Sequence, residues 1–144
     1  MNNKKDKRPP VAIGHINLIT KDVPSTSLFM QSLGLRKVFQ KKTFAVLELR
    51  GGTHLILETS SRRRAKNTIA PFDLMVDDIN ESRNLYKKMG LKPSKISTGK
   101  VHSSFIISGP DNWSFKITSS HTSCLLYTSP SPRDQRGSRM PSSA

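Results

Sequence analysis

Three of the four histidines, together with two carboxylates, are the side chains of this sequence best suited to chemistry. A neutral imidazole can ligate Zn²⁺, Fe²⁺ or Mn²⁺, and a carboxylate can complete such a site. The residues are His15, His54, His102, Glu58 and Asp73. No nucleophile constellation accompanies them. The RGGT turn at Arg50–Thr53 lacks the lysine and helix of a phosphate-binding loop. What these side chains can do therefore depends on the elements that position them.

An internal repeat supplies those elements. Lys21–Lys37 aligns with Asp77–Pro93 without a gap, at an offset of 56 residues. Each copy has the apolar spacing that predicts a helix. Asp22 and Asp78 are expected to cap the helix N-termini. Each helix is followed by a glycine that can adopt the left-handed conformation and end it, at Gly34 and Gly90.

Each helix is flanked by segments with strand character. Val11–Thr20 and Pro71–Val76 precede the helices, and three shorter strands are expected after each helix. These are Lys37–Gln40, Phe44–Leu49 and His54–Glu58 in the first copy, and Ser94–Ser97, Val101–Ile107 and Trp113–Thr118 in the second. The sequence thus predicts an α+β fold of two tandem βαβββ modules, residues 11–59 and 70–120, joined by a linker over residues 60–69.

Strand alternation divides the first predicted strand into two faces. One face carries Ile13, His15, Asn17 and Ile19. The other carries Ile16 and Leu18, which are both apolar and are expected to pack on the helix. His15 and Asn17 then lie on the face that a ligand could reach.

Five segments carry a resemblance to a known family. They are a first strand that begins near His15, DVPSTSLF with LGL over residues 22–35, FAVLELRGGTHLIL over residues 44–57, VDDI with GLKP over residues 76–93, and GPDNWSFKI over residues 109–117. In this order they resemble the vicinal oxygen chelate superfamily, which includes glyoxalase I, bleomycin- and fosfomycin-resistance proteins and extradiol dioxygenases. The resemblance implies that the modules form a cupped mixed sheet with the helices outside. It also implies a ligand in the cup between the modules, and a homodimer.

Metal-dependent members of that superfamily place one ligand on the first strand and one on the last strand of each module. Carried onto this sequence, these positions are His15, Ile56, Pro71 and Lys116, of which only the histidine can ligate a metal. Moving by one strand period from Ile56 gives His54 or Glu58 instead. We therefore expect a site without metal or other cofactor. The alternative is a divalent metal, Zn, Fe or Mn, held by His15, Glu58 and His102.

The resemblance implies a small-molecule-binding protein without the standard metal quartet. The expected ligand pocket consists of His15, Asn17, His54, Glu58, Asp73, His102, Ser104 and Lys116. The alternative function is a metal-dependent lyase, isomerase or extradiol-type dioxygenase with a non-standard ligand set. No catalytic residue is assigned. If the chain is an enzyme, the resemblance implies a glyoxalase-like lyase or a dioxygenase.

The net charge of +14 does not by itself indicate nucleic-acid binding. Most of the excess gathers near the N-terminus, in Arg62–Lys66 and in the C-terminal tail, without the interleaved aromatic residues of a nucleic-acid interface. No apolar run approaches the roughly 20 residues that span a bilayer. The single cysteine, Cys124, cannot form an internal disulfide, so the cytoplasm is the expected location.

Both ends of the chain are expected to be disordered, over residues 1–10 and 121–144. The segment Cys124–Ala144 is rich in Ser, Pro and Arg and lacks a helix or strand period after its first few residues. It also resembles a translated sequencing adaptor, with CLLYTSPSPRD and SRMPSSA flanking QRG at the position of a variable index. We therefore expect residues 124–144 to be non-native and exclude them from the fold.

Overall fold

A computed structural model describes residues 7–120 of the chain. They form two compact units, and the boundary falls at Ala65–Lys66, within the predicted linker. The predictions for residues 1–6 and for the tail from residue 121 fall outside the described residues. Among the helices of residues 7–120, none has the length and apolar character needed to cross a membrane.

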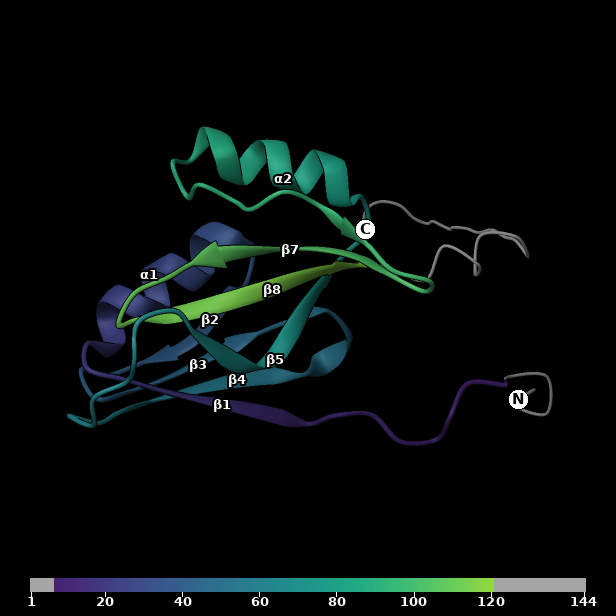
Figure 1. Cartoon of the computed structure of the whole chain (residues 1–144). Coiled ribbons are helices and arrows are strands. Elements are labelled where there is room, and N and C mark those ends of the chain that lie inside the picture. The colour runs from purple at the N-terminus through teal and green to yellow at the C-terminus, as the bar shows by residue number, and fades with distance from the viewer. Residues whose placement is uncertain (1–6, 121–144) are drawn as a thin grey trace. The chain divides into compact units, whose positions relative to one another are not determined.

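The first unit is one βαβββ module (Figure 1). Its elements are β1 (His15–Thr20), α1 (Val23–Leu33), β2 (Arg36–Gln40), β3 (Phe44–Glu48), the 3-10 turn η2 (Arg50–Gly52) and β4 (His54–Thr59). The strands form one sheet in the order β1-β4-β3-β2. The β1 strand is parallel to β4, and the other neighbours are antiparallel.

The second unit repeats this topology. Its elements are β5 (Thr68–Val76), α2 (Ile79–Lys88), β6 (Ser97–Thr98), β7 (Ser103–Ser108) and β8 (Trp113–Ser119). The sheet order is β5-β8-β7-β6, again with the first and last strands parallel. The predicted α+β fold of two βαβββ modules is therefore confirmed.

Equivalent residues start and stop the two helices. The Asp22 carboxylate accepts a hydrogen bond from the backbone N–H of Ser25 at 3.1 Å, and Asp78 accepts from Glu81 at 2.9 Å. Gly34 and Gly90, after the helices, have φ values of 123° and 83°, which disfavour any residue with a Cβ. The capping prediction from the repeat is thus confirmed at both ends.

We expect Asp78→Ala to lower the free energy of unfolding by about 1 kcal/mol, because one N–H of the first turn loses its acceptor. Asp78→Ser should lose less, since serine also caps helices. Urea unfolding followed by the fluorescence of Trp113 measures both variants. Equal losses for alanine and serine would show that the cap contributes nothing.

Each unit buries one face of its sheet against its own helix. In the first unit the fully buried side chains come from β1, β3, β4 and α1, and include Leu18, Leu47, Leu55, Leu57 and Met30. In the second unit they come from β7 and β8: Phe105, Ile107, Phe115 and Ile117. Tyr86 of α2 packs edge-on against Phe105, and burial raises the pKa of its phenol. Trp113 is also buried.

Several predicted strand boundaries are wrong, for identifiable reasons. The first strand begins at His15 instead of Val11, because its partner β4 begins at His54, directly after the η2 turn. The fifth begins earlier than Pro71, since Thr68 pairs with Trp113. The strand expected over residues 94–97 is reduced to Ser97–Thr98, and the one expected over 101–107 starts at Ser103.

Candidate functional site

The first sheet has a face opposite α1, which we call the helix-free face. Its side chains alternate with the buried ones: His15, Asn17 and Ile19 on β1, His54, Ile56 and Glu58 on β4, Phe44, Val46 and Glu48 on β3, and Arg36 and Phe39 on β2. His15 and Asn17 are exposed, whereas Leu18 and Thr20 are buried. The face assigned to them from strand alternation is therefore the one the structure has. Ile13 precedes β1 and is 64% exposed.

A row of four polar side chains crosses this face from one sheet edge to the other. Strand register places His15 beside His54, His54 beside Glu48, and Glu48 beside Arg36. The two imidazole rings have centroids 5.9 Å apart. Arg36 Nε donates to Glu48 Oε1 at 3.0 Å, and Arg36 Nη2 donates to the same oxygen. We call this set the polar row.

The charges of the polar row favour an ionised carboxylate at its centre. The hydrogen bond from Arg36, and the charges of Arg36 and His54, hold the pKa of Glu48 below its ordinary value against a smaller opposing effect of burial. Because the folded state prefers the ionised form, this contribution is present above pH 4.5 and is lost as the pH falls through the lowered pKa. At neutral pH the polar row therefore holds an Arg36–Glu48 ion pair next to the side chains of His54 and His15.

Next to the polar row the helix-free face becomes apolar. The following register line runs from Asn17 through Ile56 and Val46 to Phe39, whose ring contacts Phe44 at a centroid distance of 6.1 Å. Phe39 is 44% exposed. A molecule on this face would thus meet hydrogen-bonding groups at one end and hydrocarbon beside them.

Glu58 lies too far from His15 to share a ligand atom with it. Register pairs Glu58 with Ile19 and His15 with His54, so the two residues are four positions apart along the parallel strands. That separation is about 13 Å between backbones. The predicted pair His15 and Glu58 is not brought together, and His54 is the neighbour of His15 instead.

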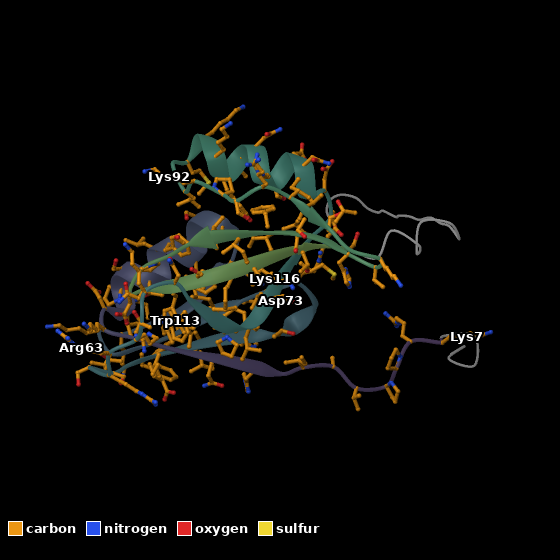
Figure 2. The ribbon with its side chains drawn as sticks, viewed as in Figure 1. Lys7, Arg63, Asp73, Lys92, Trp113 and Lys116 are labelled. Atoms are coloured by element: carbon orange, nitrogen blue, oxygen red, sulfur yellow. The ribbon has the colours of Figure 1, made fainter. Side chains whose placement is uncertain are left out.

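The second sheet also has a helix-free face, with a different composition. Asp73 of β5 pairs with Lys116 of β8, which pairs with Ile106 of β7. Figure 2 shows the labelled Asp73 and Lys116 near each other on these strands. Ser104 pairs with Thr118 one period away. Three of the four pocket residues expected from this module therefore share one face, where opposite charges stand side by side.

His102 lies just before β7, at the end of the second sheet. Its Nδ1 atom is 2.8 Å from the backbone oxygen of Ser119, and its own carbonyl accepts from Gly99 at 2.8 Å in a tight turn. The Ser119 hydroxyl accepts from the next backbone amide, Ser103. These contacts fit a residue that anchors the start of β7, because one imidazole nitrogen is already engaged.

The superfamily's four metal-ligand positions do not fit a metal here. Register makes Ile56 and Lys116 the equivalent residues, since Asn17 pairs with the first and Asp73 with the second. The lysine ammonium has no lone pair to donate. Within residues 7–120, no group of three His, Cys, Asp or Glu side chains is placed to hold an ion. A metal would have to use His15 and His54 with other donors.

Glu48 and Arg36 are the members of the polar row that sequence reasoning missed. Glu48 lies in a predicted strand, and Arg36 directly precedes another. An Arg and a Glu 12 residues apart across a short hairpin could have indicated a cross-strand ion pair. What was lacking was the register of β3 on β4, which places Glu48 beside His54, and that of β2 on β3, which places Arg36 beside Glu48.

The fold is shared with solved structures, although no protein-family model and no curated protein matches the sequence. A lactoylglutathione lyase from Agrobacterium tumefaciens superposes with a TM-score of 0.64 at 19% identity, over 78% of this chain and 96% of that one. A member of the glyoxalase/bleomycin resistance protein/dioxygenase superfamily from Sphaerobacter thermophilus gives 0.62 at 18%, over 76% and 97%. The chain has the vicinal oxygen chelate fold.

A third structure with this fold carries ligands. A variant of the fosfomycin resistance protein FosX from Listeria monocytogenes, complexed with Mn(II) and 1S,2S-dihydroxypropylphosphonic acid, superposes with a TM-score of 0.62 at 14% identity, over 78% of this chain and 94% of that one. The matched region thus covers nearly all of each of the three solved structures. At such identities the likeness establishes the fold and leaves the ligand to be argued from the residues.

Proposed function

We propose that this chain is a small-molecule-binding protein of the vicinal oxygen chelate type, and that the polar row on the helix-free face of its first sheet binds the polar end of the ligand. The observation that carries the proposal is the alignment of His15, His54, Glu48 and Arg36 on one line across the sheet. Hydrogen-bonding groups of this kind fix a ligand's orientation, and apolar surface beside them binds its body.

The ligand expected from this arrangement has an aromatic or other apolar body and one hydrogen-bonding end. Ile56, Val46 and Phe39 would contact the body, and the two imidazoles would bind the polar end. That Asp73, His102, Ser104 and Lys116 of the second unit contribute to the same ligand stays a prediction from the resemblance. The expected homodimer and cytoplasmic location also stay predictions.

A metal-dependent enzyme is the second candidate, favoured by the 5.9 Å separation of the His15 and His54 rings. Two adjacent imidazoles are suitable donors for Zn²⁺, Fe²⁺ or Mn²⁺. The FosX structure was complexed with Mn(II). If this candidate holds, the activity belongs to the lyase or dioxygenase types of the superfamily, with a ligand set other than the standard quartet.

We expect His15→Ala to weaken ligand binding roughly 3- to 10-fold, which corresponds to one exposed hydrogen bond. His15 is exposed, so the larger cost of an unpaired buried group does not apply. A library of small aromatic acids, phenols and alcohols, screened by ¹H–¹⁵N NMR, identifies the probe. The amides of residues 15, 17, 54 and 56 should shift on binding.

A matched control is Lys92→Ala, an exposed residue of the second unit (labelled in Figure 2) that should leave binding unchanged. Titration calorimetry with Zn²⁺ and Mn²⁺ on the unmodified protein and on the His15→Ala variant separates the two candidates. Stoichiometric metal binding that disappears in the variant would favour the enzyme. Shifts confined to other surfaces would contradict the proposed site.

A further inference from the structure

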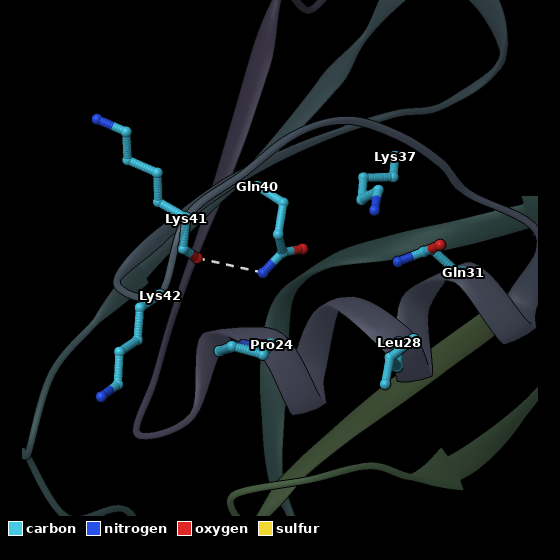
Figure 3. Close-up of a pocket in the computed structure, with 7 residues that line it drawn as sticks. All are labelled: Pro24, Leu28, Gln31, Lys37, Gln40, Lys41 and Lys42. Atoms are coloured by element: carbon cyan, nitrogen blue, oxygen red, sulfur yellow. Dashed lines mark hydrogen bonds between the residues drawn. The ribbon is translucent and has the colours of Figure 1, made fainter.

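A groove lies on the other side of the first sheet, where α1 meets β2. It has a volume of about 390 Å³ and is lined by Pro24, Leu28, Gln31, Lys37, Gln40, Lys41 and Lys42. Figure 3 shows Lys37 and Gln40 over the helix that carries Pro24, Leu28 and Gln31, with Lys41 and Lys42 extending from the turn beside it. All seven residues belong to the first unit, and none belongs to the polar row.

A β-bulge at Val38 creates the groove's polar wall. Lys37 pairs with Leu47 and Phe39 pairs with Val46, so Val38 is an extra residue in β2. Without it, Gln40 would lie on the same face as Arg36. With it, Gln40 pairs with the buried Ala45 and lies on the helix side with Lys37. Bulges that re-aim a side chain occur often at sheet edges and beside functional sites.

The groove combines positive charge with exposed hydrocarbon. Three of its lining residues are lysines, and none is acidic. Leu28 is 67% exposed even though it lies on a helix that packs against the sheet. The Lys41 ammonium lies 5.7 Å from the centre of the Phe39 ring, which belongs to the helix-free face, so Lys37 and Lys42 supply the positive charge of the groove. An anion with an apolar part would match both features.

Two glutamine side chains of the groove, Gln31 and Gln40, determine which hydrogen-bonding group a ligand needs. Gln31 Nε2 donates to the Ser27 hydroxyl at 3.1 Å, and Gln40 Nε2 donates to the Lys41 carbonyl at 3.2 Å. With the amides in these orientations, each glutamine directs its Nε2 group to the protein and keeps its side-chain oxygen for another donor. The groove thus accepts hydrogen bonds as well as attracting negative charge.

We propose that this groove binds a small organic acid: an anionic carboxylate or phosphate end for the lysines, a hydroxyl or N–H donor for the glutamine oxygens, and a short apolar body over Pro24 and Leu28. The volume of about 390 Å³ is within the range of small-molecule sites. The groove would be a second ligand site, on the opposite side of the sheet from the polar row.

Mandelate is a suitable probe, because it combines a carboxylate, a hydroxyl and a phenyl ring. We expect saturable ¹H–¹⁵N NMR shifts at residues 31, 37 and 40–42 of the full chain at low salt, and none with neutral mandelamide. Phenyl phosphate in place of mandelate shows whether the site prefers a phosphate end. The double variant K37Q/K42Q should weaken binding about tenfold, since two charge-assisted contacts are lost.

The matched control is K92Q/K95Q, which removes the same charge from exposed lysines of the second unit. It should leave mandelate affinity unchanged. Equal weakening in both double variants would mean non-specific attraction to a basic protein and would overturn the proposal, as would the absence of saturable shifts. Shifts at residues 15 and 54 with none in the groove would support the polar row and overturn the groove, so the two proposals can fail separately.

Discussion

Phe105→Ala is expected to lower the free energy of unfolding of the second unit by about 3–5 kcal/mol. Phe105 is 1% exposed and lies at the middle of the core, paired with Ile117 across the sheet and in edge contact with Tyr86 of α2. Truncation removes the ring contact between β7 and Tyr86 of α2 and leaves a cavity that α2 cannot fill without moving. The loss therefore includes both the transfer of the ring and the cavity.

Ile106→Ala is the matched control, because the next residue of the same strand points to the helix-free face. It should cost less than about 1.5 kcal/mol, since a half-exposed side chain loses less burial. Trp113 is the single tryptophan of the sequence and lies in this unit, so its fluorescence in urea reports the transition of interest. Similar losses for both variants would mean that the strand faces are assigned wrongly.

The fold was predictable because its signals are local and occur twice. The capping aspartates, the glycines after the helices and the apolar spacing between them recur at a fixed offset, so each copy supports the other. The errors lie at strand ends, because the neighbouring strand determines how far the pairing extends. Val11–Gly14 has strand character but no described strand extends beside it, because β4 starts only at His54.

The candidate site was predictable only in part, because its residues come together through register. Alternation along β1 assigns the faces of His15 and Asn17 without any knowledge of the neighbouring strands. The neighbour of His15 depends on the register of β1 against β4. That register places His54 directly beside His15 and Glu58 four residues further along β4. The place of Glu48 depends on the pairing of β3 with β4, and that of Arg36 depends in addition on the pairing of β2 with β3. No local sequence pattern predicts the bulge at Val38 in β2.

A second large effect is expected at a buried pair of hydroxyl groups in the first unit. Thr20 at the end of β1 and Thr26 in the first turn of α1 are both 0% exposed, and their hydroxyl oxygens are 2.7 Å apart. Thr26→Val keeps the shape of the side chain but leaves the Thr20 hydroxyl buried without its partner. We expect this variant to lose about 1–3 kcal/mol of unfolding free energy.

The double variant T20V/T26V should be more stable than the sum of the two single losses predicts, because it removes both polar groups and leaves neither unsatisfied. A coupling of about 0.5–3 kcal/mol is expected for a buried pair in contact. Urea unfolding, followed by far-UV circular dichroism, is measured for the unmodified protein, the two single variants and the double variant, which together form a double-mutant cycle.

Thr59→Val is the control for the hydroxyl cycle. Thr59 pairs with Thr20 across the sheet, but it is exposed and its hydroxyl contacts the Lys21 carbonyl only at 3.4 Å. Water can replace so long and exposed a contact, so the change should stay within about 0.5 kcal/mol. Losses from T20V and T26V that simply add would mean that the two hydroxyls do not depend on each other.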